Sequence, residues 1–183
     1  MSPFFLIVSM HWLYLIIASI IIFTWTLILE NKKKKELDVS VLFDKSCLYE
    51  LTSNIGQVNK LLGRSEGFHH SQSARFGWRC VGGQIELLAY CYINGTREEK
   101  KIGLVDVGQW VGLKLSISKD YYRFTVTRAD KMKVSVLYIS KKSENINWRV
   151  QFSRLFTYRL YPYFGGIISA PHDMKIQVKN KLK

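Results

Sequence analysis

The segment from Phe68 to Ile93 constrains the fold more than any other part of the chain. Its centre is Gly82-Gly83, and two successive glycines accept the positive φ angles that a tight hairpin turn requires. A two-residue loop also fixes the pairing of the flanking strands, so that Arg79 faces Glu86. The sequence therefore predicts a β-hairpin of defined register.

The two faces of this hairpin differ in chemistry. One face carries Phe76, Trp78, Cys80, Ile85, Leu87, Ala89 and Cys91, which suits a hydrophobic core, and the other carries Arg75, Gly77, Arg79, Glu86, Leu88, Tyr90 and Tyr92. Arginine binds a carboxylate through two hydrogen bonds, and tyrosine stacks on sugar rings. We interpret Arg75, Arg79, Glu86, Tyr90 and Tyr92 as a ligand-binding face. The alternative is an exposed strand face with an Arg79–Glu86 ion pair worth about 0.2–1 kcal/mol.

Other short segments alternate between apolar and polar residues and end at turn residues. The predicted strands are 37–43, 101–107, 112–118, 121–127, 133–139, 148–152, 157–164 and 174–178, and Asn94-Gly95 predicts a second hairpin turn. Residues 47–52 are compatible with a strand or a short helix, whereas 54–68 and 141–147 are predicted loops. Many short strands without a long amphipathic helix predict a mainly β protein, an antiparallel β-sandwich of the jelly-roll type.

An apolar segment precedes this domain. From Phe4 to Leu29 the chain has no Asp, Glu, Lys or Arg, and a helix needs about 20 residues to cross a bilayer. A cleaved signal peptide is the alternative, but no basic region precedes the apolar run, which is also too long. The predicted organisation is a transmembrane helix in residues 1–31, a basic linker in 32–36 and the sandwich in 37–183.

The charge distribution bears on partners and on location. The chain has 27 Lys and Arg against 14 Asp and Glu, a net charge of +13, which favours acidic glycans, lipid head groups or nucleic acid. Nucleic acid ranks lowest, because the basic residues are spread along the chain and match no reader motif. Lys32 to Lys35 follow the apolar segment, so the positive-inside rule places the domain in the cytoplasm.

Few residues are candidates for catalysis. A lyase acting on an acidic polysaccharide needs a cation, a base and an acid. The candidates for these roles are His70, Arg75, Tyr90, Tyr163 and His172. Adjacent histidines on an extended segment point to opposite sides, and the three cysteines have no metal spacing, so the sequence predicts no metal site and no cofactor.

Five motifs carry a family resemblance: Asn59-Lys-Leu-Leu-Gly63, His69-His-Ser-Gln-Ser-Ala-Arg-Phe-Gly-Trp-Arg79, Leu88-Ala-Tyr-Cys-Tyr-Ile-Asn-Gly95, Tyr158-Arg-Leu-Tyr-Pro-Tyr-Phe-Gly-Gly166 and Ala170-Pro-His-Asp-Met174. They resemble a family of small bacterial envelope proteins that has no assigned activity. The resemblance covers residues 55 to 178 and implies an exported domain, in contrast to the charge rule. More distantly, the strand order is similar to concanavalin-like jelly rolls, which include lectins and polysaccharide lyases; this is a fold-level analogy.

These observations favour a membrane-anchored, noncatalytic module that binds an acidic glycan or another anionic envelope polymer. One alternative is an interaction protein that docks on a protein partner, for which arginine and tyrosine are also suited. The other alternative is the polysaccharide lyase.

Overall fold

The computed structural model describes residues 12–26, 35–49, 57–128, 134–141, 157–165 and 170–180. The chain divides into two compact units, Met1–Lys34 and Lys35–Lys183. Residues 12–26 of the first unit form a helix. Within the described ranges, no helix combines the length and the apolar character needed to cross a membrane. The predicted transmembrane segment, residues 1–31, lies partly outside these ranges.

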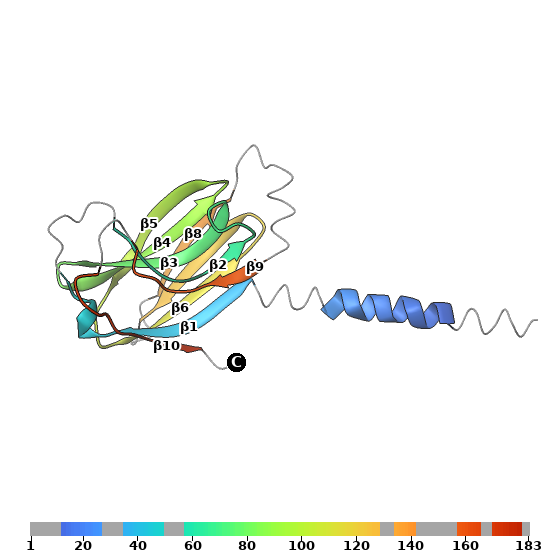
Figure 1. The fold of residues 1–183 in the computed structure, drawn as a ribbon, viewed down its shortest axis with the longest axis horizontal. Coiled ribbons are helices and arrows are strands. Elements are labelled where there is room, and N and C mark those ends of the chain that lie inside the picture. Colours follow the sequence, from blue (N-terminus) through green and yellow to red (C-terminus); the bar gives the residue numbers. More distant parts are fainter. Residues whose placement is uncertain are drawn as a thin grey trace, which may run out of the picture. The chain divides into compact units, whose positions relative to one another are not determined.

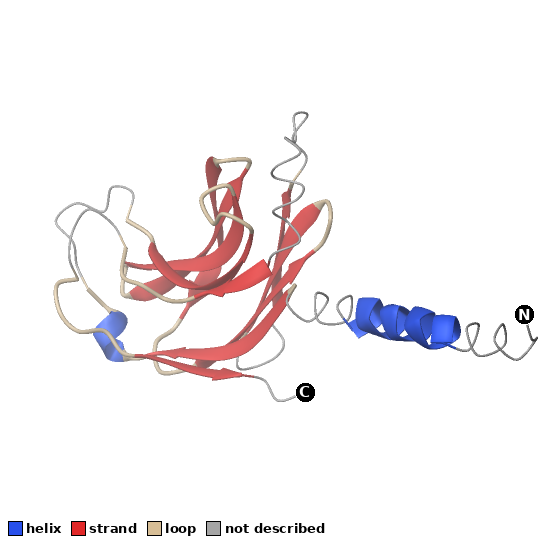
Figure 2. Cartoon of the chain, turned by 45° about the vertical axis from the view of Figure 1, so that its right-hand side comes forward, coloured by secondary structure: helices blue, strands red, loops and turns tan. Residues whose placement is uncertain are grey.

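The second unit consists of two antiparallel sheets of five strands each (Figure 1). Sheet A contains, in spatial order, β10 (Ile176–Asn180), β1 (Glu36–Phe43), β6 (Trp110–Ile117), β7 (Tyr121–Thr127) and β8 (Val134–Ser140). Sheet B contains β5 (Thr96–Val105), β4 (Gln84–Ile93), β3 (Gln72–Val81), β2 (Asn59–Glu66) and β9 (Thr157–Leu160). A short 3-10 helix, η1 (Lys45–Cys47), follows β1. Figure 2 shows the strands as two facing layers, which confirms the predicted β-sandwich.

The central hairpin has the predicted register. Arg79 pairs with Glu86 and Arg75 pairs with Tyr90 across β3 and β4. Gly82 and Gly83 have φ angles of 57° and 75°, so both occupy the left-handed region that the turn requires. Most other predicted strands are also present, but β5 begins five residues before the predicted start and β9 ends four residues before the predicted end. The predicted strand 148–152 lies outside the described residues.

The predicted loop 54–68 is wrong, because much of it forms strand β2. This strand pairs with β3 on one side and with β9 on the other. A bulge between Lys60 and Gly63 places Leu61 and Leu62 together in the core, which interrupts the alternation by which strands are recognised. Gly63 is required because a Cβ there would collide with the backbone of Ala74 and Arg75.

The inner faces of the two sheets form one hydrophobic core. Sheet B contributes Phe76 and Trp78, and sheet A contributes Phe43 and Phe124, with ring centroids 5.1 Å apart for Phe76 and Phe124. Phe43 lies 5.5 Å from Trp78. The three cysteines are buried free thiols, as the hairpin register predicts for two of them.

One charged pair lies inside the sandwich. Lys141, at the end of β8, and Glu66, at the end of β2, are each 2% exposed, and Lys141 Nζ lies 2.5 Å from Glu66 Oε2. Tyr122 donates a hydrogen bond of 3.0 Å to the same carboxylate oxygen. Lys141 was expected in a polar loop, but the carboxylate and the Ser118 carbonyl provide its ammonium group with hydrogen-bond acceptors inside the protein.

We expect Lys141→Met to lower the free energy of unfolding by about 3–5 kcal/mol, because it leaves the Glu66 carboxylate buried without its counter-ion. The double variant Lys141→Met/Glu66→Gln should recover most of this loss, since it removes the second charge and keeps an acceptor for Tyr122. Urea unfolding followed by tryptophan fluorescence measures both values. Equal stability of the double and single variants would contradict this account.

Candidate functional site

A glycine in the centre of sheet B lets residues of β2 and β4 meet across β3. Gly77 pairs with Lys60 on one side and with Leu88 on the other, and it has no side chain between them. Lys60 therefore reaches over β3, and its Nζ lies 4.8 Å from the centre of the Tyr90 ring. An added Cβ at Gly77 would collide with Val58. This glycine therefore allows a cation to stack on Tyr90 on the outer face of sheet B.

Arg75 is the unusual residue on this face, because it is a buried cation that has no counter-ion within the described part of the chain. The residue is 7% exposed. No described residue forms an ion pair or a hydrogen bond with its guanidinium group. Its Cζ instead lies 5.7 Å from the centre of the Tyr163 ring. Burial lowers the pKa of Arg75, although a guanidinium group remains protonated at neutral pH. The site therefore contains a largely buried positive charge beside an aromatic ring.

The chain turn after β9 brings Tyr163 to this position. Pro162 interrupts the edge strand, and Tyr163 then forms an isolated antiparallel bridge with Lys60. The Lys60 Nζ lies 5.6 Å from the centre of the Tyr163 ring, so one ring contacts both cations. Gly165 is needed nearby, because a Cβ there would approach the Tyr163 ring to 2.7 Å. The residues gathered on this face, called the Arg75 cluster below, are Lys60, Arg75, Tyr90, Tyr92, Tyr158 and Tyr163.

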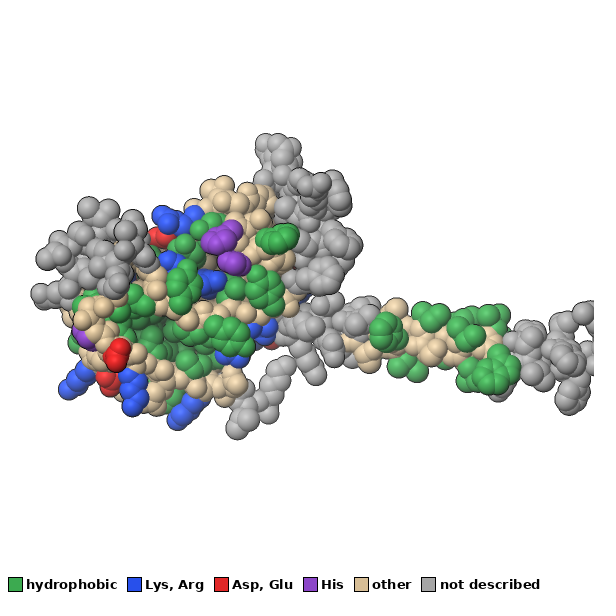
Figure 3. All heavy atoms as spheres, viewed as in Figure 1, with side chains coloured by type: hydrophobic (Ala, Val, Ile, Leu, Met, Phe, Trp, Pro, Cys, Tyr) green, Lys and Arg blue, Asp and Glu red, His purple; other side chains and the backbone are tan. Residues whose placement is uncertain are grey.

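Two histidines lie beside the Arg75 cluster. A turn at Phe68–Ser71 brings the ring centroids of His69 and His70 to 4.2 Å, with the rings tilted by 45°, so the expectation that they point to opposite sides is wrong. His69 Nδ1 lies 3.2 Å from the Tyr158 hydroxyl, and the His70 ring lies 5.2 Å from the Tyr92 ring. Figure 3 shows histidines next to hydrophobic and basic side chains on this face of the domain.

His172 does not belong to this cluster. Its Nε2 lies 2.7 Å from the backbone oxygen of Ser46, in η1. The structure thus brings together four of the five sequence-derived catalytic candidates, His70, Arg75, Tyr90 and Tyr163, and separates the fifth from them.

The charge around the cluster is mainly positive. Arg97 and Glu99, on the neighbouring strand β5, form an ion pair of 3.2 Å, so the carboxylate nearest to Lys60 in the described residues is already engaged. Burial, and then the charge of Arg75, lower the pKa of Lys60. Burial and the neighbouring Tyr92 hydroxyl raise the pKa of Tyr90 to about 12, so Tyr90 stays neutral.

Arg79 and Glu86 form a separate, closed group near the hairpin turn. Arg79 Nε donates a hydrogen bond of 2.6 Å to Glu86 Oε2, and Lys101 Nζ lies 2.9 Å from Glu86 Oε1. Burial alone would raise the pKa of Glu86, but the hydrogen bonds from Lys101 and Arg79 and their charges outweigh it and lower the pKa. The predicted ion pair is confirmed. Because Glu86 already neutralises it, Arg79 is a weaker candidate for ligand binding than Arg75.

The outer face of sheet B is more buried than an exposed strand face. Leu88 and Tyr90 are buried with Val58 in a small second hydrophobic cluster. Sequence reasoning missed Lys60 and Tyr158, because β2 was not recognised and the pairing of β9 with β2 depends on it. The sole sequence indication was Gly77 between alternating large residues, which is typical of a close approach of side chains or backbone.

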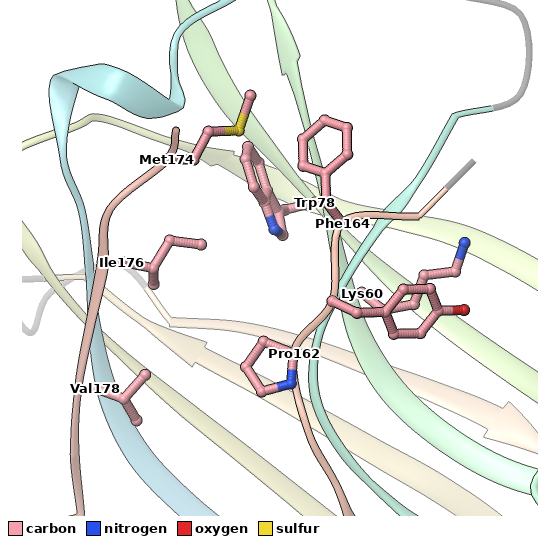
Figure 4. Close-up of a pocket in the computed structure, with 8 residues that line it drawn as sticks. Lys60, Trp78, Pro162, Phe164, Met174, Ile176 and Val178 are labelled. Atoms are coloured by element: carbon pink, nitrogen blue, oxygen red, sulfur yellow. The ribbon is translucent and has the colours of Figure 1, made fainter. Parts of the chain in front are cut away.

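A second concave feature lies at the open edge between the sheets. This groove has a volume of about 260 Å³, and its lining is mostly apolar. Figure 4 shows Met174, Ile176 and Val178 facing Trp78, Phe164 and Pro162, while the nitrogen of Lys60 points away from β10. The groove therefore offers no charged group to a ligand.

The described part of the chain contains no group of three or more His, Cys, Asp or Glu side chains placed to hold a metal ion. Neither a scan against protein-family models nor a search of curated proteins found a match to the chain. The resemblance to the envelope family therefore stays a prediction.

Arg75 and Arg79 provide a matched pair for a stability test, because they lie on the same face of the same strand. Arg79→Met removes a charge-assisted hydrogen bond to buried Glu86, and we expect a loss of about 1–2 kcal/mol. Arg75→Met removes a buried charge that no described carboxylate compensates, so its effect should be near zero or stabilising. Urea unfolding at pH 7 compares the two. A larger loss for Arg75→Met would mean that this arginine is a structural residue.

Proposed function

We propose that the domain binds an acidic glycan, or another anionic envelope polymer, on the outer face of sheet B. The observation that carries this proposal is Arg75, a 7% exposed cation without an acidic partner among the described residues. Burying an unpaired charge costs free energy, and a bound anion would offset that cost. Lys60 adds a second positive charge, and its side chain lies over the Tyr163 ring, which Arg75 also contacts.

The aromatic residues support a sugar as the rest of the ligand. Tyr158 and Tyr163 are exposed, while Tyr92 is half-buried, so their rings and hydroxyls are accessible at the rim of the cluster. Tyrosine combines an apolar ring face with a hydroxyl, which suits sugar rings. The guanidinium plane of Arg75 suits a carboxylate, as in a uronic acid.

We further propose that the domain is anchored to a membrane through residues 1–31. This part of the proposal rests on the sequence, in which Phe4 to Leu29 contains no charged residue. The concanavalin-like jelly roll is likewise proposed at the level of fold analogy. A noncatalytic module of this type would hold an anionic polymer close to the membrane.

Binding is tested with the full chain in phosphatidylcholine nanodiscs and a galacturonate hexamer at low salt, by calorimetry. We expect saturable binding that weakens as salt is added, because charge attraction is screened. Arg75→Gln should weaken the affinity by about tenfold or more, since it removes the buried cation. The matched control is Arg123→Gln, on the outer face of sheet A, where Arg123 also stacks on a tyrosine.

The control variant should bind as tightly as the native chain, and a neutral galactose hexamer should not bind. If no anionic polymer binds at low salt, the proposal is wrong, and docking on a protein partner becomes the better explanation of the arginine and tyrosine face.

One observation favours a second function, elimination by a lyase. His69 Nδ1 and the Tyr158 hydroxyl lie 3.2 Å apart beside Arg75. Burial, and then the positive charges of His70 and Arg75, lower the pKa of His69, which favours the unprotonated imidazole that a general base requires. His69 would take the proton next to a uronate carboxylate as the adjacent C–O bond breaks. Tyr158 would protonate the leaving oxygen, and the product carries a new C=C bond.

Incubation with polygalacturonate tests this second function. A lyase forms an unsaturated product that absorbs in the ultraviolet, and His69→Gln and Arg75→Gln should each abolish it. Binding without any increase in absorbance would leave the noncatalytic module as the function.

A further inference from the structure

The histidine pair offers a proton-dependent charge beside the Arg75 cluster. His69 and His70 are exposed, and their ring centroids lie 4.2 Å apart. Each ring contacts a tyrosine of the cluster, His69 through Tyr158 and His70 through Tyr92. They are thus placed where a ligand bound on the tyrosines would meet them.

We propose that His69 and His70 are additional binding residues for the anionic ligand, and that ligand binding is coupled to the uptake of a proton by this pair. The inference rests on the proposed function, because it concerns the same site. It adds a condition that the proposed function does not contain, namely that affinity depends on pH near neutrality.

The charged and titratable groups of the Arg75 cluster and of the neighbouring strand β5 lie on five strands and one turn. They are Lys60 on β2, Arg75 on β3, Tyr90 and Tyr92 on β4, Arg97 and Glu99 on β5, Tyr158 on β9, and Tyr163 in the turn after β9. The cations Lys60, Arg75 and Arg97 outnumber the single carboxylate of Glu99, which is itself paired with Arg97. The field at the histidines is therefore positive in the free protein.

This field opposes protonation when the site is empty. Burial, and then the charges of His70 and Arg75, lower the pKa of His69. A bound carboxylate cancels part of the positive field and favours the imidazolium form, so the pKa rises on binding. Protons are therefore taken up between the lowered pKa of the free site and the higher pKa of the complex. Affinity must increase as pH falls through this range.

Calorimetry of the full chain in phosphatidylcholine nanodiscs, with the galacturonate hexamer at pH 5.5 to 8, tests the coupling. The sugar carboxylates stay ionised over this range, so a change of affinity reports the protein. A rise of one unit in the histidine pKa corresponds to a gain of about tenfold in affinity at the acidic end. Titrations in two buffers of different ionisation heat should show proton uptake near pH 6.5.

Two variants assign the effect. The double variant His69→Gln/His70→Gln should flatten the pH dependence and remove the proton uptake. His172 contacts the Ser46 backbone outside the cluster, so His172→Gln should change neither the pH dependence of the affinity nor the proton uptake. Equal affinity of the native chain at pH 5.5 and 8, or an equal flattening by His172→Gln, would overturn the inference while leaving the proposed function intact.

A measurement without ligand separates the two proposals further. Arg75→Gln removes a positive charge that lowers the pKa of His69, so the His69 pKa measured by NMR titration should rise in this variant. If the hexamer binds at no pH, the proposed function fails. An unchanged His69 pKa in Arg75→Gln would then show that the histidines do not sense the cluster, and the inference would fail separately.

Discussion

The antiparallel pairing of β3 with β4 determines on which side of sheet B each of their side chains lies. Since the side-chain period of a strand is two, one register directs Phe76 and Trp78 inward and Arg75 and Tyr90 outward, and a shift by one residue would reverse both sets. The core and the Arg75 cluster are therefore two results of the same hairpin. A sequence change that moved this turn would lose both together.

Buried charges occur in two different arrangements in this domain. Inside the sandwich, Lys141 and Glu66 compensate each other, and Tyr122 completes the hydrogen bonding of the carboxylate. On the outer face of sheet B, Arg75 and Lys60 lie against Tyr163 without such compensation among the described residues. The first arrangement is complete in itself and therefore structural. The second has no such partner in the described residues, and this difference is the basis of the proposed anion binding.

The parts of the fold that follow local rules could be predicted from the sequence. Gly82-Gly83 determines the hairpin register by its backbone conformation alone, and the paired faces followed from it. Strand β2 was missed because its bulge puts Leu61 and Leu62 on one side and so breaks the alternation. Without β2, neither the stacking of Lys60 on Tyr90 through the space at Gly77 nor the position of Tyr158 was predictable. The burial of Lys141 depends on a partner 75 positions away, which no local pattern reveals.

The two edges of the sandwich differ in a way that concerns the cluster. On one side β5 lies beside β8, and Arg128 from the end of β7 donates hydrogen bonds to the backbone of Leu104 in β5, which ties the sheets together. On the other side the apolar groove separates β10 from the turn that carries Tyr163. The two sheets are thus connected along one edge of the sandwich and separated by a groove along the other. Tyr163 lies at this open edge and its ring contacts both cations. A displacement of the edge would therefore also move the ring beside Arg75 and Lys60, and with it change the electrostatics of the outer face.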